Sequence, residues 1–331
     1  MIYYVNQGND PAYNIALEEF CFKKLRQFDR IFLLWINEPA IIVGRYQNTL
    51  AEINADYVKE KGIHVVRRIT GGGAVYHDLN NLNYTIISDE YEGDSNFNFK
   101  IFSQPVIETL AELGVKAQFS GRNDITIDGK KICGNAQAYI NGRIMHHGCI
   151  LFNTDLSVLS KALEVSKETV NFKGIQSVRS RVDNILPNLP EKITVHQFAD
   201  KILEQMKKSF PEMREYRFNE AELAEIEKAR REKFGNWDWN YGRNPAADIV
   251  RERRFTAGTI QTFLNVNNGK IDNVHFYGTF FGKNIHIEEV EMALEGVRYT
   301  TEAVKQRLSE LDTAQYFAGF SIDELSEAIV G

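Results

Sequence analysis

The first part of the chain combines one helical pattern with several short apolar runs. Behind Asp10-Pro11, the segment YNIALEEFCFKKL carries apolar residues at helical spacing, and an aspartate followed by proline is a favourable helix start. Continuous apolar runs at residues 31–36 and 40–43 are separated by Asn37-Glu38-Pro39, which predicts two strands. A short helix through NADYVKEK then ends at Gly62, and residues 63–67 form the next strand.

Three consecutive glycines, Gly71, Gly72 and Gly73, come shortly after that strand, in RRITGGGAVYHD. The segments that follow, AVYHD and LNYTIIS, are also strand-like, whereas the phosphate loops of Rossmann and P-loop proteins lie between a strand and a helix. We therefore exclude both loop types. Exposed backbone N–H groups beside arginines suit a phosphate or a carboxylate. The alternative is a tight bend at a sheet edge with solvated arginines.

Two dipeptide turns in the middle of the chain predict antiparallel pairing. Asp128-Gly129 separates DITI from KKICGNAQAYI, and Asn141-Gly142 separates that segment from IMHHGCILFN. Both dipeptides favour two-residue hairpin turns. Consecutive hairpins indicate an α+β fold with mostly antiparallel sheets, not a parallel doubly wound sheet.

Further helices are expected around these strands. Residues 98–114 read as a helix closed by a glycine, with Pro105 as a kink or start within it. Thr194 and Gln197 have the spacing of a capping box, and Asn219 precedes a polar helix that a glycine closes.

A Gly-, Pro- and Asn-rich segment, NWDWNYGRNPAADIVRERR, marks a domain boundary. Beyond it come strands around an Asn268-Gly269 turn and two final helices, which suffice for a small α+β domain. We expect one domain at residues 1–242 and a small C-terminal domain at residues 243–331, with a hinge near residues 242–248.

Composition narrows the function classes. The 331 residues are 43% apolar and 25% charged, as in ordinary globular proteins, and the net charge of -6 disfavours a nucleic-acid partner. The N-terminus has neither a basic start nor a long apolar stretch, and no run approaches the length that spans a bilayer. Cys21, Cys133 and Cys149 form neither a CxxC pair nor a metal-ligand spacing. We expect a soluble cytoplasmic protein with no membrane segment.

Two adjacent pairs of polar residues are candidates for a site. Strand alternation puts Lys130 and Lys131 on opposite faces, so at least one of them faces solvent, and the alternative is that both are turn lysines. His146 and His147 also point to opposite faces, so they cannot both bind one metal ion from a regular strand. At most one histidine lines a site, and the alternative for it is a hydrogen-bonded core residue.

Two other features have simpler readings. Cys133 and Cys149 lie in apolar strands, where cysteine is commonly a small core residue, and the sequence assigns no base that would activate either thiol. The segment KGIQSVRSRVDN carries three basic residues, which either face an acidic partner or form a solvated helix face.

Five motifs together resemble the lipoate–protein ligase A family, in the same order and at compatible spacings. They are RRITGGGAVYHDLNNLNYT, GRNDITIDGKKICGNAQAY, HHGCILFNTDL, KGIQSVRSRVDN and WDWNYGRNP. The resemblance covers essentially the whole chain. It implies a catalytic domain of the biotinyl/lipoyl ligase fold, an α+β unit, followed by a smaller accessory domain.

The resemblance also implies a reaction. Such enzymes activate (R)-lipoate with ATP and magnesium to give lipoyl-AMP and pyrophosphate, with no tightly bound prosthetic group. They then transfer the lipoyl group to a lysine of an acceptor, the E2 subunits of 2-oxoacid dehydrogenases or the glycine-cleavage H protein. We expect a monomer.

Site residues follow from matching the motifs. The family lysine matches Lys131, whose ammonium is expected to bridge the lipoyl carboxylate and the phosphate. The ATP-binding positions fall on Arg68, Gly73, Ala74, Val75, Tyr76 and Lys131, where backbone groups are expected to hold adenine and phosphate, which accounts for the missing side chains. The lipoate-binding positions fall on Lys131, Arg68, Gly72, His77 and Ala136.

Three further residues are expected to support the site. Asn123 and Asp124 belong to the GRND motif, and Asp124 is a candidate for binding magnesium or for orienting Lys131. His147 is a candidate base for the transfer step, the alternative being loss of the acceptor proton to water.

Two other functions stay open on the sequence. An octanoyl- or lipoyl-transferase would move an acyl group through a cysteine thioester without ATP, and a non-catalytic lipoate- or carrier-binding module would need no catalytic lysine. The C-terminal domain resembles the ATP-dependent ligases, and Lys131 with GGGAVY argues against a module. In the family, the position of Cys133 is often a small residue such as serine. The sequence favours a ligase.

Overall fold

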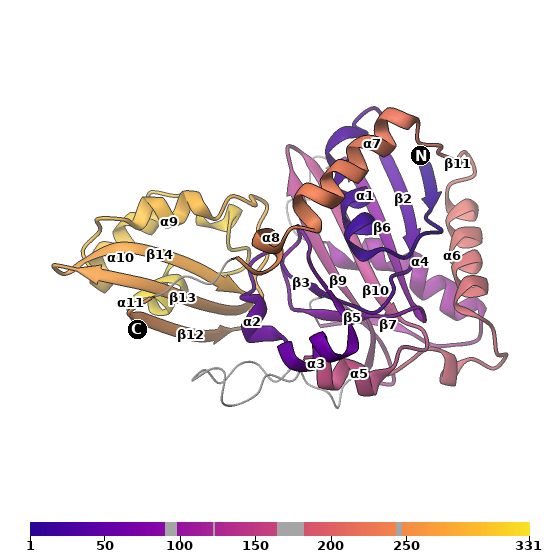
Figure 1. Cartoon of the computed structure of the whole chain (residues 1–331), viewed down its shortest axis with the longest axis horizontal. Helices are drawn as coiled ribbons and strands as arrows, with labels where there is room; N and C mark the ends of the chain where they lie inside the picture. Colours follow the sequence, from indigo (N-terminus) through magenta and orange to yellow (C-terminus); the bar gives the residue numbers. More distant parts are fainter. Residues whose placement is uncertain (90–97, 122, 164–181, 243–246) are drawn as a thin grey trace.

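The computed structural model describes residues 1–89, 98–121, 123–163, 182–242 and 247–331, which form a larger and a smaller lobe (Figure 1). Three predicted features fall wholly or partly outside the described residues. These are most of the basic segment at 173–184, Arg122 of the GRND motif, and residues 243–245 of WDWNYGRNP with part of the expected hinge.

The larger lobe is built on a mixed sheet, which has eight strands within the described residues. In spatial order these are β11 (Arg214–Glu215), β1 (Ile2–Val5), β2 (Arg30–Trp35), β6 (Asn81–Asp89), β10 (Arg143–Leu151), β9 (Lys130–Ile140), β8 (Asp124–Ile127) and β7 (Gln118–Ser120). Strand β1 pairs in parallel with β11 and β2, and the other pairs are antiparallel. The α+β fold with mostly antiparallel sheets is therefore confirmed.

Helices cover both faces of this sheet (Figure 1). Helices α4 (Phe99–Glu112) and α6 (Val195–Ser209) pack on one face, and α1 (Pro11–Lys24) packs on the other, beside α7 (Glu220–Ala229). The predicted starts are present, since Asp10 caps α1 and Thr194 forms a capping box at α6. Pro105 lies inside α4.

A second, smaller sheet carries the glycine run. It consists of β4 (His64–Arg67), β3 (Ala40–Val43) and β5 (Val75–His77), and it packs with α3 (Ala55–Lys61) and α5 (Leu156–Ala162). The three glycines lie in the loop between β4 and β5. The prediction that strands lie on both sides of them is confirmed.

The predicted turns have the required backbone. Asp128, Asn141 and Asn268 have φ of 49°, 50° and 51°, and the glycine after each is also at positive φ, as a two-residue hairpin of the primed type requires. Because two-residue loops fix strand register, Lys131 and the histidine pair are placed by these turns.

The smaller lobe is a three-stranded antiparallel sheet with helices, within the part of the chain that the structure describes. Its elements are β12 (Ile249–Phe255), β13 (Gly258–Asn267), β14 (Lys270–Gly278), α9 (Glu288–Leu294), α10 (Thr301–Ser309) and α11 (Ile322–Val330). The sequence reading predicted no strand at residues 249–254, which it described only as part of the boundary segment. They form an edge strand whose four charged residues hide the strand pattern.

The two lobes meet at specific contacts. The ring of Tyr46 stacks on Phe280 with centroids 4.6 Å apart, and the Gly278 N–H donates to the Tyr46 carbonyl over 2.7 Å. Helix α8 (Trp237–Tyr241) lies between the lobes, beside α2 (Thr49–Glu52) (Figure 1). The smaller lobe therefore packs directly against the segments that precede the glycine loop.

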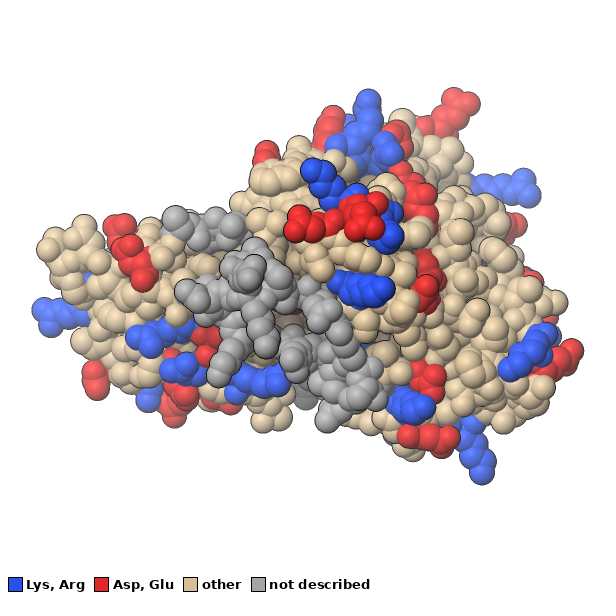
Figure 2. Space-filling view, turned by 60° about the horizontal axis from the view of Figure 1, so that its bottom comes forward, with Lys and Arg blue, Asp and Glu red and all other residues tan. Residues whose placement is uncertain are grey.

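The described surface carries charged side chains of both signs. On the face shown in Figure 2, basic and acidic side chains are interspersed over both lobes. Among the described helices, none has the length and apolar character that crossing a bilayer demands.

The lobe interface predicts a pH dependence of stability. Burial raises the pKa of Glu52 in α2 to about 7, and the charge of Glu252 in β12 adds to the rise. Because the folded-state pKa lies above the unfolded one, stability falls as the pH rises through about 7. Glu52→Gln should therefore stabilise the protein more at pH 8 than at pH 5, with a difference of about 2 kcal/mol, since one pH unit is worth about 1.4 kcal/mol.

Urea unfolding at the two pH values measures this difference. The exposed Glu212→Gln is the control and should give the same small change at both. An equal effect of Glu52→Gln at pH 5 and pH 8 contradicts the assignment.

Candidate functional site

The glycine loop is held from inside by one arginine. Arg68 is 5% exposed, and its guanidinium donates to the Ile42, Gly71 and Gly73 carbonyls and to the Thr70 hydroxyl, over 2.6–2.9 Å. Burial lowers the pKa of Arg68 to about 10, so it stays charged at neutral pH. These four bonds use four of its five N–H groups. Arg68 therefore holds the loop in shape, and these four bonds do not use the second N–H of Nη1.

The space around the three glycines differs from one to the next. A Cβ on Gly71 would lie 2.1 Å from the carbonyl oxygen of Phe280 in the smaller lobe, and Gly72 has φ of 88°. A Cβ on Gly73 would meet only Thr279, at 3.9 Å. At Gly71 the smaller lobe therefore excludes a side chain, a contact that the sequence did not predict.

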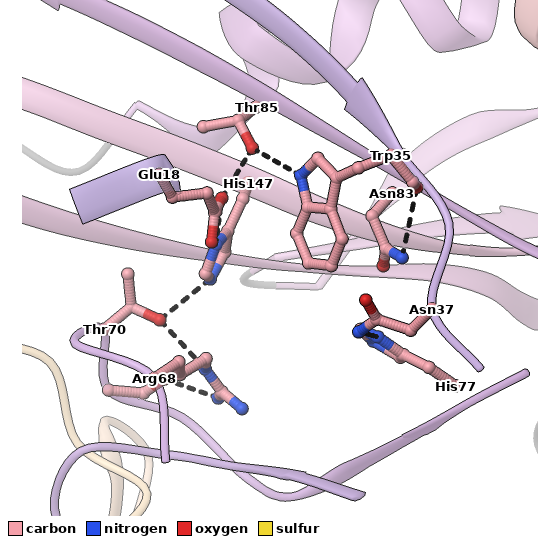
Figure 3. A network of polar contacts seen from close by, with 10 residues as sticks. Glu18, Trp35, Asn37, Arg68, Thr70, His77, Asn83, Thr85 and His147 are labelled. Atoms are coloured by element: carbon pink, nitrogen blue, oxygen red, sulfur yellow. Dashed lines mark hydrogen bonds and ion pairs between the residues drawn. The ribbon is translucent and has the colours of Figure 1, made fainter. Parts of the chain in front are cut away.

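A buried chain of polar groups connects the loop to helix α1 (Figure 3). His147 on β10 contacts Thr70 through Nε2 at 2.8 Å and Glu18 through Nδ1 at 2.9 Å. The Thr85 hydroxyl donates to the same Glu18 carboxylate, and Trp35 Nε1 donates to Thr85 over 3.1 Å. Because Thr70 also accepts from Arg68, the chain fixes the loop against the sheet.

His77 lies in the same region but is held separately (Figure 3). Its Nδ1 is 3.0 Å from the Asn37 side chain, and its ring is 5.9 Å from that of Trp35. Burial lowers the pKa of His77 to about 3, with the Arg68 charge as the next cause, so the ring is neutral. The buried Nε2 has no hydrogen-bond partner among the described residues. His77 therefore presents an uncharged ring whose Nε2 makes no hydrogen bond within the described residues.

The histidine pair separates as strand alternation predicts. His147 faces α1 and the glycine loop, whereas His146 contacts Tyr84 and Gln137 on the opposite face, under α4. Burial lowers the pKa of His146 well below its usual value, so it is a neutral core residue.

The lysine pair separates in the same way. Lys130 Nζ lies 2.9 Å from Asp183, with its side chain 57% exposed, whereas Lys131 Nζ lies 2.8 Å from Asp124, with its side chain 33% exposed. Asn123, next to Asp124, is clamped to Asn135 by side-chain bonds in both directions, 2.5 and 2.9 Å long. The end of β8 that carries Asp124 is thus fixed to the strand that carries Lys131.

Cys149 lies two residues after His147, on the same face of β10. It pairs with Gly134 of β9, and the charges of Lys131 and Arg68 act to lower the pKa of its thiol. Burial nevertheless raises the pKa of Cys149 to about 11 and that of Cys133 well above its usual value. Both are protonated thiols at neutral pH, which disfavours a thioester mechanism.

The remaining predicted residues lie around this region. Tyr76 is buried in the core of the small sheet, and Val75 packs against the core around α1. A ligand beside β5 would therefore contact the backbone of these two residues and not their side chains. Ala136 packs with Phe99 and with Phe281 of the smaller lobe, and Phe281 also approaches Gly72. The predicted lipoate-binding position Ala136 therefore lies beside an aromatic ring of the other lobe.

The candidate magnesium ligand is Asp124. Within the described ranges, no three His, Cys, Asp or Glu residues group as a metal site. Asp124 is paired with Lys131.

Sequence reasoning missed Glu18, Trp35 and Thr70. A glutamate among apolar residues in YNIALEEFCF is a usable signal, because an acidic side chain on a buried helix face needs a partner. The partner itself comes from a strand 129 positions away, and no local pattern predicts that contact.

Comparisons with known proteins agree along the whole chain. Residues 10–207 match the lipoyl protein ligase A/B catalytic domain, and residues 244–329 match the bacterial lipoate protein ligase C-terminus. The curated lipoate-protein ligase LplJ of Bacillus subtilis is 41% identical, covering 99% of this chain and 100% of its own. Lipoate–protein ligase 1 of Staphylococcus aureus is 40% identical, covering 97% of each.

Solved structures give the same picture. P. falciparum LipL1 in complex with lipoate superposes with a TM-score of 0.82 at 26% identity, covering 99% of this chain and 98% of its own. Lipoate-protein ligase A bound with ATP superposes with a TM-score of 0.61 at 25% identity, covering 73% of this chain and 99% of its own. A bi-partite lipoate protein ligase of Thermoplasma acidophilum, from a study that includes its E2 lipoyl domain, superposes with a TM-score of 0.63 at 28% identity. The match covers 75% of this chain and 98% of its own.

The contact at Gly71 predicts an effect on stability. Gly71→Ala should lower the free energy of unfolding by about 1–3 kcal/mol, because the methyl group collides with the Phe280 carbonyl and the lobes must separate slightly. Gly73→Ala is the matched control, with open space at its Cβ, and should change it by less than about 0.5 kcal/mol. Denaturant unfolding compares the two, and equal effects would show that the lobes do not pack at Gly71.

Proposed function

The chain belongs to the lipoate–protein ligase family, and from that premise we propose how its own residues carry the reaction. It is an ATP-dependent lipoate–protein ligase, which joins lipoate to protein lysines through an activated acyl group. The observation that carries the assignment of residues is the Lys131 ammonium, which lies 2.8 Å from Asp124. Its strand, β9, pairs with β10, whose His147 contacts Thr70 of the glycine loop. We propose that Lys131 and Arg68 act on one ligand beside the glycine loop.

The first step joins two anions. The carboxylate oxygen of (R)-lipoate attacks the α-phosphate of ATP, the bond to the β-phosphate oxygen breaks, and pyrophosphate leaves. Lys131 offsets the repulsion with a compact charge and three N–H donors, of which Asp124 occupies one in the free protein. The backbone of Gly73, Ala74, Val75 and Tyr76, together with Arg68, is proposed to bind the nucleotide.

Magnesium is proposed to enter bound to the phosphates of ATP, a common arrangement because Mg²⁺ retains water and needs few protein ligands. Asp124 is the proposed carboxylate contact. The proposed mechanism gives the magnesium ion no separate step.

The lipoyl tail is proposed to lie along Gly72, His77 and Ala136. The neutral ring of His77 and the apolar contacts at Ala136 are compatible with an uncharged tail. Trp35, which lies beside His77, extends this wall. The supporting roles are proposed for Asn123, which fixes the β8 end, and for His147, which fixes Thr70.

In the second step, the neutral amine of an acceptor lysine attacks the carbonyl carbon of lipoyl-AMP, an amide forms, AMP leaves, and the amine proton passes to His147 or to water. His147 is already bonded through both ring nitrogens, so accepting the amine proton would require it to leave Thr70. We propose the E2 lipoyl domains of 2-oxoacid dehydrogenases and the glycine-cleavage H protein as acceptors. The archaeal relative studied with its E2 lipoyl domain supports the first of these.

The wider setting is proposed from the sequence. A cytoplasmic monomer fits the composition, with a catalytic domain at residues 1–242 and an accessory domain at residues 243–331 that turns about a hinge near residues 242–248. The smaller lobe would move Phe280 and Phe281 relative to the glycine loop in such a motion.

Removing the lysine tests the assignment. Lys131→Ala should lower the rate of lipoyl-AMP formation at least about 10²–10³-fold, because a charge that stabilises the transition state is lost. Lys130→Ala is the matched control, on the opposite face of the same strand, and should keep the wild-type rate. Single-turnover chromatography of lipoyl-AMP measures both.

The same assay separates the ligase from a transferase. Cys133→Ser and Cys149→Ser should retain activity, and product should form only with ATP. Activity without ATP, or its loss in a folded cysteine variant, would restore the thioester mechanism.

A further inference from the structure

Gly134, three residues after Lys131, lies directly beneath the end of the lysine side chain. A Cβ built on Gly134 would be 2.7 Å from Lys131 Nζ and 2.8 Å from Lys131 Cε. The same Cβ would be 4.0 Å from Asp124 Oδ1, an ordinary contact distance. The lysine therefore reaches Asp124 by crossing the space that a side chain at position 134 would fill.

The backbone does not itself require glycine at this position. Gly134 is absent from the residues with positive φ, and it pairs in regular register with Asp124 on β8 and with Cys149 on β10. Alanine adopts such a strand conformation without strain, and it loses less conformational entropy on folding than glycine does. The side chain of Lys131 is thus the contact that excludes a larger residue.

A β-bulge brings the two residues onto one face. Thr126 pairs with Lys131 and Ile125 with Cys133, so Ile132 is an extra residue in β9. Lys131 and Gly134 are three residues apart, so in a regular strand their side chains would point to opposite faces. Because Ile132 is an extra residue, Lys131 instead lies on the same face as Gly134 and Asp124. The turn, the bulge and the glycine together direct one lysine along the strand toward its carboxylate.

We infer that Gly134 is a positioning residue for the adenylation step, which it serves by leaving the path of Lys131 open. The inference rests on the proposed role of Lys131. Gly134 contacts neither substrate in this assignment, and its effect passes through the lysine.

Gly148, another glycine of the same sheet, has a different role. A Cβ there would lie 2.2 Å from the Tyr84 ring and 2.4 Å from Asn135 Oδ1, both in the buried core under α4. Substitution at Gly148 strikes packed core groups, whereas substitution at Gly134 strikes the far end of a flexible side chain, which moves at little cost to the fold. The two positions separate a folding role from a positioning role.

Gly134→Ala tests the inference. Its melting temperature should stay within about 2 °C of wild type, while the rate of lipoyl-AMP formation falls at least about 10²-fold, because small displacements of a catalytic group have effects of that size. Gly8→Ala, whose Cβ would have no contact closer than 3.6 Å, is the control and should change neither quantity.

A double-mutant cycle shows whether the effect passes through the lysine. In the Lys131→Ala background, adding Gly134→Ala should alter the residual single-turnover rate by less than about twofold, since the two changes act on one interaction. A crystal structure of Gly134→Ala should show Lys131 Nζ out of hydrogen-bonding contact with Asp124 and an unchanged backbone.

Each failure has a distinct meaning. If Lys131→Ala keeps full activity, the proposed function of the lysine is wrong. If Lys131→Ala loses activity but Gly134→Ala keeps it, or if Lys131 stays in place in the crystal structure, the inference about Gly134 is wrong and the proposed function stands.

Discussion

One buried guanidinium, that of Arg68, determines the shape of the glycine loop, and the site depends on that shape. Backbone carbonyls in a tight loop cannot all pair with one another, and a buried carbonyl without a partner is costly. Arg68 supplies donors to two carbonyls of the loop and one of β3, and through Thr70 it joins the loop to His147 and Glu18. The charge that holds the loop also lies where an anionic ligand is expected.

The lysine of the site depends on a different constraint. Lys131 is directed by a hairpin turn, a bulge and a glycine, all local to two adjacent strands. The loop and the lysine thus come from separate sheets, and the packing of the two sheets brings them together. In the proposed reaction both motifs are needed, since neither alone offers two positive groups to two anions.

Sequence reasoning predicted the parts that local chemistry determines. The hairpin at Asp128-Gly129, the cap at Asp10 and the position of the glycines between strands follow from short-range rules and are present. It could not predict the partner of Glu18, or the contact of Gly71 with Phe280, because these join residues that only the tertiary fold brings together. The charged edge strand β12 was missed because its polar residues obscure the strand pattern.

The central claim is that Lys131, held beside the glycine loop, binds the carboxyl and phosphate oxygens of the activated acyl group. A crystal structure of the full chain with a non-hydrolysable lipoyl-adenylate analogue tests it most directly. The account predicts Lys131 Nζ within hydrogen-bonding distance of both the acyl and the phosphate oxygens, with the phosphate against the backbone of Gly73 to Tyr76. An analogue bound elsewhere, with Lys131 still paired only to Asp124, would contradict it.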